Sequence, residues 1–229
     1  MIKILSSVII SFALIGCATK PQAPISYDAK LIDSNKSSIG VVINEIPKPN
    51  SSFPGADCLL CIATASLYHK TLNSHIDTLK SDDLKNIKDD LVSLLTSRGL
   101  KAVSISESVD AKKLPDVAAV QENGPKADFT KIGAKYGVDR IIYININFVG
   151  IERKYASYIP VGLPMATARG EVYMVNLKSQ KYEWYRPLES TRTPVATWDE
   201  PPNYSALTGD FYEAMKSLKN DVLQPFHAN

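Results

Sequence analysis

The sequence predicts an α+β fold, a two-layer sandwich with helices packed on one face of a mixed sheet. A short β-branched segment at residues 38–46 precedes a helical stripe, which is typical of strands connected through helices. Two later alternating segments are joined by a short turn around Lys178 and Ser179, which indicates an antiparallel hairpin. A chain that begins with helical crossovers and ends with a meander favours two layers, one of strands and one of helices.

Each element has its own pattern. We expect strands at 38–46, 100–106, 138–155, 166–177 and 181–190, and helices at 84–98, after Asp128 and after Tyr204. Ser81 is expected to cap the first of these helices, and Gly99 to end it. In the clearest strand, Ile142, Ile144 and Ile146 lie on one face, whereas Tyr143, Asn145 and Asn147 are expected on a solvated face.

The amino terminus has the pattern of a secretion signal. A lysine is followed by an apolar run from Ile4 to Ile15, well short of the ~20 residues of a membrane-spanning helix. The run ends in "LIGC", which resembles the lipobox of bacterial lipoproteins and implies a lipid on Cys17. The residues that follow, Ala18 and Thr19, include no Asp, and by resemblance to enteric sorting rules this favours the outer membrane.

These observations divide the chain into a lipoprotein signal peptide (1–16), a flexible tether (17–37) and a single periplasmic domain (38–229). The tether is predicted because Pro, Ser and Lys are frequent there and no period is visible. The formal charge of the whole chain is +2, which favours no nucleic-acid partner. The predicted location is the periplasmic face of the outer membrane, to which the lipid anchors the protein.

The order of four segments resembles a group of small proteobacterial outer-membrane lipoproteins of unknown function with the fold of the TolB amino-terminal domain. The segments are "SIGVVI", "LTSRGLKAVSI", "KIGAKYGVDRIIYININ" and "ARGEVYMVNLKSQKYEWYR", which together span about residues 38–186. The group includes the curli secretion subunit and lipoprotein activators of penicillin-binding proteins. The resemblance implies a protein that acts by binding other proteins rather than an enzyme.

Two cysteines, Cys58 and Cys61, lie in the segment "GADCLLCIATASLY". Asp57 could cap a helix beginning at Cys58, which would bring both thiols to one face of its first turn. In an oxidising compartment we expect them to form a disulfide that fixes this turn. The alternative is a membrane-tethered thiol-disulfide oxidoreductase that uses the same pair, since a helix amino terminus lowers a thiol pKa.

No metal site, cofactor or catalytic residue is predicted. His69 and His75 do not follow Cys61 at a zinc-finger spacing, and Ile62 stands where haem attachment requires a histidine. The chain shows neither a nucleophile elbow nor a phosphate-binding glycine loop. A wall-associated structural role is a weaker alternative, because no wall-binding motif is present.

The predicted function is therefore that of a protein-binding component of an envelope assembly, whose partner is an unidentified envelope protein. The expected contacts lie in two proline-rich loops that flank the hairpin, 155–166 and 186–204. The candidate contact residues are Tyr155, Tyr158, Trp198 and Tyr204, because aromatic side chains dominate binding hot spots.

Overall fold

The computed structural model describes residues 21–28, 30, 37–195 and 197–227. Its strands are β1 (Ser38–Ile43), β2 (Asn50–Ser52), β3 (Lys101–Ser104), β4 (Arg140–Glu152), β5 (Tyr155–Ala156), β6 (Ile159–Pro160), β7 (Met165–Asn176) and β8 (Lys181–Arg192). Its helices are α1 (Leu59–Tyr68), α2 (Lys70–Ile76), α3 (Ile87–Ser97), α4 (Thr130–Tyr136) and α5 (Ser205–Leu223), with 3₁₀ turns at Asp82–Asn86, Ala111–Lys113 and Gln224–Phe226.

Six strands form one mixed sheet in the order β3-β1-β4-β7-β8, with β2 paired to the far end of β4. Strands β5 and β6 form a separate two-stranded antiparallel sheet. β1 runs parallel to both β3 and β4, whereas β4, β7 and β8 are successive antiparallel neighbours. The parallel pairs require crossover connections, which the helical segments supply, while a tight turn suffices for the β7–β8 hairpin. The predicted mixed sheet and hairpin are confirmed.

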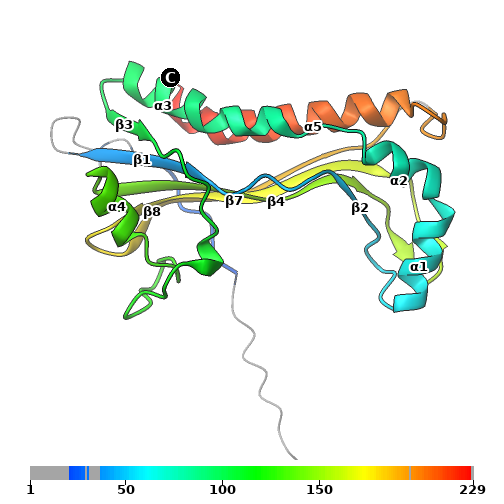
Figure 1. Cartoon of the computed structure of the whole chain (residues 1–229), viewed down its shortest axis with the longest axis horizontal. Coiled ribbons are helices and arrows are strands. Elements are labelled where there is room, and N and C mark those ends of the chain that lie inside the picture. Colours follow the sequence, from blue (N-terminus) through cyan, green and yellow to red (C-terminus); the bar gives the residue numbers. More distant parts are fainter. Residues whose placement is uncertain (1–20, 29, 31–36, 196, 228–229) are drawn as a thin grey trace, which may run out of the picture.

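Helices α3 and α5 lie side by side along one face of the sheet (Figure 1). Their apolar stripes, which include Leu91 and Leu95 of α3 and Phe211 and Leu218 of α5, are fully or almost fully buried. They belong to the same core cluster as Ile142, Ile144 and Ile146 of β4, the face that the alternation predicted. The predicted α+β class, with helices packed on the sheet, is confirmed.

The opposite face is partly covered as well, which the sequence did not predict. Tyr143 of β4, expected on a solvated face, is buried beneath α4 and the segment that precedes it (Figure 1). Its ring centroid lies 5.3 Å from that of Phe129, and its hydroxyl donates to the carbonyl of Val109 at 3.0 Å. A tyrosine can be buried in this way because its one polar atom has a hydrogen-bond partner.

The helix ends follow the predictions in part. Gly99 follows the C-cap of α3 with positive φ, as predicted, and Gly137, also with positive φ, is the C-cap of α4. Ser81 occupies the N-cap position, as predicted, but its side chain makes no capping hydrogen bond; its hydroxyl donates instead to the carbonyl of Pro47 at 3.1 Å. The expected helix at 84–98 starts as a 3₁₀ turn and becomes α-helical at Ile87.

Part of the segment predicted to be a tether lies on the domain. Ile25 forms an isolated antiparallel bridge with Tyr185 of β8, with N–O distances of 2.8 and 3.0 Å. The ring of Tyr27 lies 4.5 Å from that of Phe226. The predicted signal peptide and Cys17 fall outside the described residues, so the lipid anchor stays a prediction.

Strand β4 is longer than β1 and continues beyond it to pair with β2. Between the two, the side chain of Asn44 replaces a strand neighbour: it donates to the carbonyl of Ile146 at 2.7 Å and accepts from the Ile146 amide at 2.9 Å. At the far end, β2 passes so close that a Cβ on Gly150 would lie 1.7 Å from the carbonyl oxygen of Asn50. Only glycine fits this approach.

Substitution of this glycine tests the attachment of β2. Gly150→Ala should lower the free energy of unfolding by at least ~1 kcal/mol, because the backbone of β2 must move away. Gly209→Ala is the matched control, since nothing lies within 4 Å of its added Cβ. Alanine in the interior of α5 should raise stability by up to ~1 kcal/mol. Urea unfolding measures both changes, and equal stability of Gly150→Ala and wild type would contradict the close approach.

Candidate functional site

The cysteine pair forms a disulfide at the start of α1, as the sequence predicted. The Cα atoms of Cys58 and Cys61 are 4.9 Å apart. Cys58 is itself the N-cap, because its backbone is extended and its sulfur accepts a hydrogen bond from the Cys61 amide at 2.9 Å. Asp57 is therefore not the N-cap, and the helix begins one residue later than expected.

The surroundings of the two sulfur atoms favour a structural bond. Cys61 is buried, and its Sγ lies 3.6 Å from the hydroxyl of Ser157, while the Sγ of the exposed Cys58 lies 3.6 Å from the hydroxyl of Tyr158. Reactive thiols are activated by nearby cationic groups. These hydroxyl groups carry no charge, so the geometry favours a structural staple that closes the first turn of α1 rather than an activated thiol.

The two predicted loops meet at His69, at the junction of α1 and α2. The hydroxyl of Tyr155 lies 2.9 Å from His69 Nε2, and Arg153 Nη1 lies 3.2 Å from the same nitrogen. The guanidinium of Arg153 in turn stacks on the ring of Trp198, 4.8 Å from its centroid. We name His69, Arg153, Tyr155 and Trp198 the His69 junction; it joins three segments that are distant in the sequence.

The chemistry of the junction follows from burial. Burial and the neighbouring Arg153 lower the pKa of His69 to about 4, and Asp199 opposes this shift only partly. The imidazole is therefore neutral at pH 7. Arginine can only donate, so Nε2 accepts and the proton of the neutral ring is on Nδ1. With Nε2 occupied by these contacts, His69 holds the loops together and is poorly placed to act as a general base.

Two of the four predicted contact residues are corrected by their burial. Tyr155 is 6% exposed and Tyr204 is 3% exposed, so neither offers a surface to a partner. Tyr204 belongs to the main core and its ring lies 5.4 Å from that of His75. The sequence could not distinguish a loop aromatic that fills the core from one that faces solvent. Tyr158, 48% exposed, and the partly buried Trp198 remain candidates.

The structure also reveals a surface that the sequence analysis left unassigned. Helix α1 buries only the small side chains Cys61 and Ala65. Its large apolar residues project outward next to those of the β5–β6 hairpin and the turn that follows. The exposed members are Leu59, Leu60, Ile62, Leu67, Tyr68, Tyr158, Ile159, Val161 and Leu163, nine of the thirteen exposed large hydrophobic side chains in the described part of the chain. We name this set the apolar tip. The absence of charge from Cys58 to Tyr68 was the available signal.

Metal binding finds no support in the described ranges, where no group of three or more His, Cys, Asp or Glu side chains could hold an ion. His75 is engaged elsewhere, with its Nε2 2.7 Å from the hydroxyl of Thr208. Among the helices of these ranges, none combines the length and the apolar character needed to cross a membrane.

Comparisons with known proteins found similarity only at the level of structure. No family model and no curated protein matches the sequence. The similar solved structures include PelC of Paraburkholderia phytofirmans, a dodecamer, at 11% identity, with 90% of this chain and 96% of that chain covered and a TM-score of 0.39. They also include a lipoprotein of Neisseria meningitidis (14% identity, 81% and 99% covered, TM-score 0.30) and the LpoB C-terminal domain of Escherichia coli (13%, 69% and 86%, TM-score 0.21). Small proteobacterial lipoproteins, the class that the sequence resembles, are thus among the structures similar to this chain.

The buried histidine predicts a specific dependence of stability on pH. The pKa of His69 is lowered in the folded protein, so its contribution is present above the unfolded pKa of about 6.5 and is lost as the pH falls towards about 4. His69→Gln keeps an uncharged side chain that does not titrate. The stability difference between wild type and variant should therefore shrink by about 1–3 kcal/mol between pH 7 and pH 4. Urea unfolding across this range measures it, and two parallel pH curves would contradict the assignment.

Proposed function

We propose that this chain is a lipoprotein anchored to the periplasmic face of the outer membrane, where it binds another protein as a component of an envelope assembly. The signal-like run that ends in "LIGC" supports the anchor on Cys17. A thioether-linked diacylglycerol together with an acylated amine gives several buried chains, at ~0.8 kcal/mol for each CH₂ group, and such an anchor holds stably.

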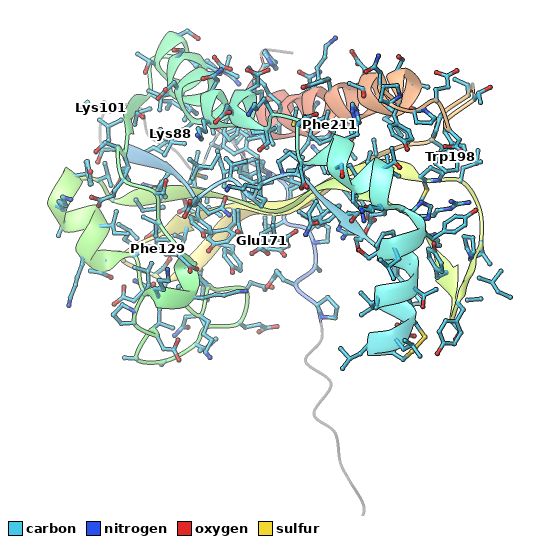
Figure 2. The ribbon with its side chains drawn as sticks, turned by 45° about the vertical axis from the view of Figure 1, so that its right-hand side comes forward. Lys88, Lys101, Phe129, Glu171, Trp198 and Phe211 are labelled. Carbon is cyan, nitrogen blue, oxygen red and sulfur yellow. A yellow bond between two sulfur atoms is a disulfide. The ribbon has the colours of Figure 1, made fainter. Side chains whose placement is uncertain are left out.

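The observation that supports protein binding best is the way Trp198 is held. It lies in the proline-rich loop 193–203, on the α5 side of the molecule (Figure 2). The stacked guanidinium of Arg153 fixes the indole from one side, and the main core packs against it. Val195 in the same loop is fully exposed. An aromatic side chain that is ordered before binding loses less conformational entropy when a partner arrives.

No catalytic role is proposed. The titratable groups of the His69 junction contact one another, and the cysteines are joined in a bond whose neighbours are hydroxyl groups. The alternative, a tethered thiol-disulfide oxidoreductase, has in its favour only that Cys58 is exposed at the start of a helix. We rank it second, because no cationic side chain is among the contacts of either sulfur that the structure describes.

The anchor is tested at the residue that would carry it. Cys17→Ser should abolish incorporation of labelled palmitate and leave the precursor uncleaved, because the lipoprotein peptidase acts after the thiol is modified. Metabolic labelling and electrophoretic mobility measure both effects. Cys58→Ser is the control: it removes another cysteine and should leave labelling unchanged. Labelling of the Cys17→Ser protein at the wild-type level would exclude the anchor.

The protein-binding surface is tested by site-specific photocrosslinking in cells. A photoreactive amino acid at Val195 should capture one envelope protein, because this side chain projects freely from the loop that holds Trp198. The same amino acid at Tyr212, which is 40% exposed on α5, is the matched control. Mass spectrometry identifies the products. If both positions capture the same proteins at the same yield, the loop is not a specific docking site.

A further inference from the structure

We propose that the end of the apolar tip at the start of α1 and the β5–β6 turn lies in the interfacial layer of the membrane that carries the lipid anchor. The proposal rests on the proposed function for the anchor at Cys17. It adds a second point of membrane contact, made by the folded domain itself. The residues concerned are Leu59, Leu60, Ile62, Tyr158 and Ile159.

The first argument is the exposure of this end. Leu59 is 88% exposed and Leu60 is 65% exposed. A helix rich in large apolar side chains normally buries them against the core, yet α1 packs on the domain only through Cys61 and Ala65. The exposed surface of a lone leucine needs no explanation, whereas several large exposed apolar side chains on one helix and the hairpin beside it mark a place that something covers.

The second argument is the absence of charge. From Cys58 to Tyr68 and from Tyr155 to Ala168 the chain carries no charged side chain; Asp57 and Lys154 precede these two stretches. A protein interface normally surrounds its apolar centre with polar and charged groups. A lipid interface favours aliphatic side chains together with amphipathic rings such as that of Tyr158, whose hydroxyl can stay among the head groups.

The third argument is the position of the chain end that leads to Cys17. The segment 21–28 pairs with the edge strand β8 through Ile25, whose side chain packs on the face of the sheet opposite α3 and α5. Helix α1 projects on this same side, with its first turn farthest from α2 (Figure 1). Only three residues lie between Cys17 and Pro21, so their Cα atoms are at most ~14 Å apart when the chain is extended. A bilayer surface is wider than the domain. If the lipid on Cys17 holds this face of the domain close to the bilayer, helix α1, which projects from the same face, reaches the bilayer surface.

The arrangement also explains why the protein-binding loop is elsewhere. Trp198 lies on the α5 side of the molecule, away from the first turn of α1 (Figure 2). With the tip in the lipid, the loop 193–203 points away from the membrane. The two surfaces then have separate occupants, lipid for the tip and a protein for the loop. Tyr158, a candidate protein contact by its exposure, is thereby assigned to the lipid surface.

Tryptophan fluorescence tests the contact. Mature lipidated protein carrying Leu60→Trp is reconstituted into vesicles of phosphatidylethanolamine and phosphatidylglycerol with brominated acyl chains. Bromine quenches a nearby indole, so the added emission should fall by about half or more relative to unbrominated vesicles, because interfacial side chains reach about 5–10 Å into the bilayer boundary. Tyr212→Trp, on the opposite side of the domain, should be quenched no more than wild type.

Equal quenching at positions 60 and 212, in protein that floats with the vesicles, would overturn the proposal. If a photoreactive amino acid at position 60 crosslinks two copies of the chain, and the emission of Leu60→Trp is not quenched, the membrane contact is overturned in favour of self-association. A mass spectrum without lipid on Cys17 counts against the anchor alone. In that case quenching of Leu60→Trp in excess vesicles still supports membrane contact by the tip. Unquenched emission in excess vesicles still contradicts that contact.

Discussion

The pairing of β4 with its neighbours is the constraint on which the rest of the structure depends. Near its start β4 is flanked by β1 and β7, and this part carries the core beneath α3 and α5. Further along β4, β2 takes the place of β1 as the neighbouring strand. Between the two, the side-chain amide of Asn44 bonds the backbone N–H and C=O groups of Ile146. A buried unpaired amide and carbonyl would cost ~1–3 kcal/mol each. One continuous strand therefore joins the core to the segments that form the candidate site, and the site inherits its position from the sheet.

The far end of β4 is fixed by charge as well as by hydrogen bonds between strands. Glu152, which is buried, forms two 2.8 Å bonds with Arg169 of β7, and the Arg169 guanidinium stacks on Phe148 at 4.8 Å. Such a fork-shaped pair favours one geometry over others. Directly beyond it come Arg153 and Tyr155, whose side chains meet at His69. The positions of Arg153 and Tyr155 at the His69 junction thus follow from the pairing of β4 with its neighbours.

The sequence predicted the parts of this structure that depend on local pattern. The β4 alternation, the β7–β8 hairpin, the glycine after α3 and the helix after Tyr204 depend on short-range signals, and each is confirmed. What failed depends on tertiary contacts. Tyr143 was expected in solvent because nothing in its own strand shows that α4 will cover it, and Tyr155 and Tyr204 were expected at a surface because loop aromatics look alike in sequence. The Cys58–Cys61 bond was predictable from spacing, whereas its partners Tyr158 and Ser157 are about 100 residues away.

The staple and the exposed helix explain each other. An isolated ten-residue helix is marginal in water, because forming its first turn is the unfavourable step. Most protein helices overcome this by burying a wide apolar stripe, but α1 buries only Cys61 and Ala65 and leaves its leucines outside. The disulfide closes that first turn covalently and so supplies the order that packing does not. The disulfide thus holds an apolar helix in place without burying it, and its apolar side chains stay accessible. Whatever covers the apolar tip must therefore come from outside the domain.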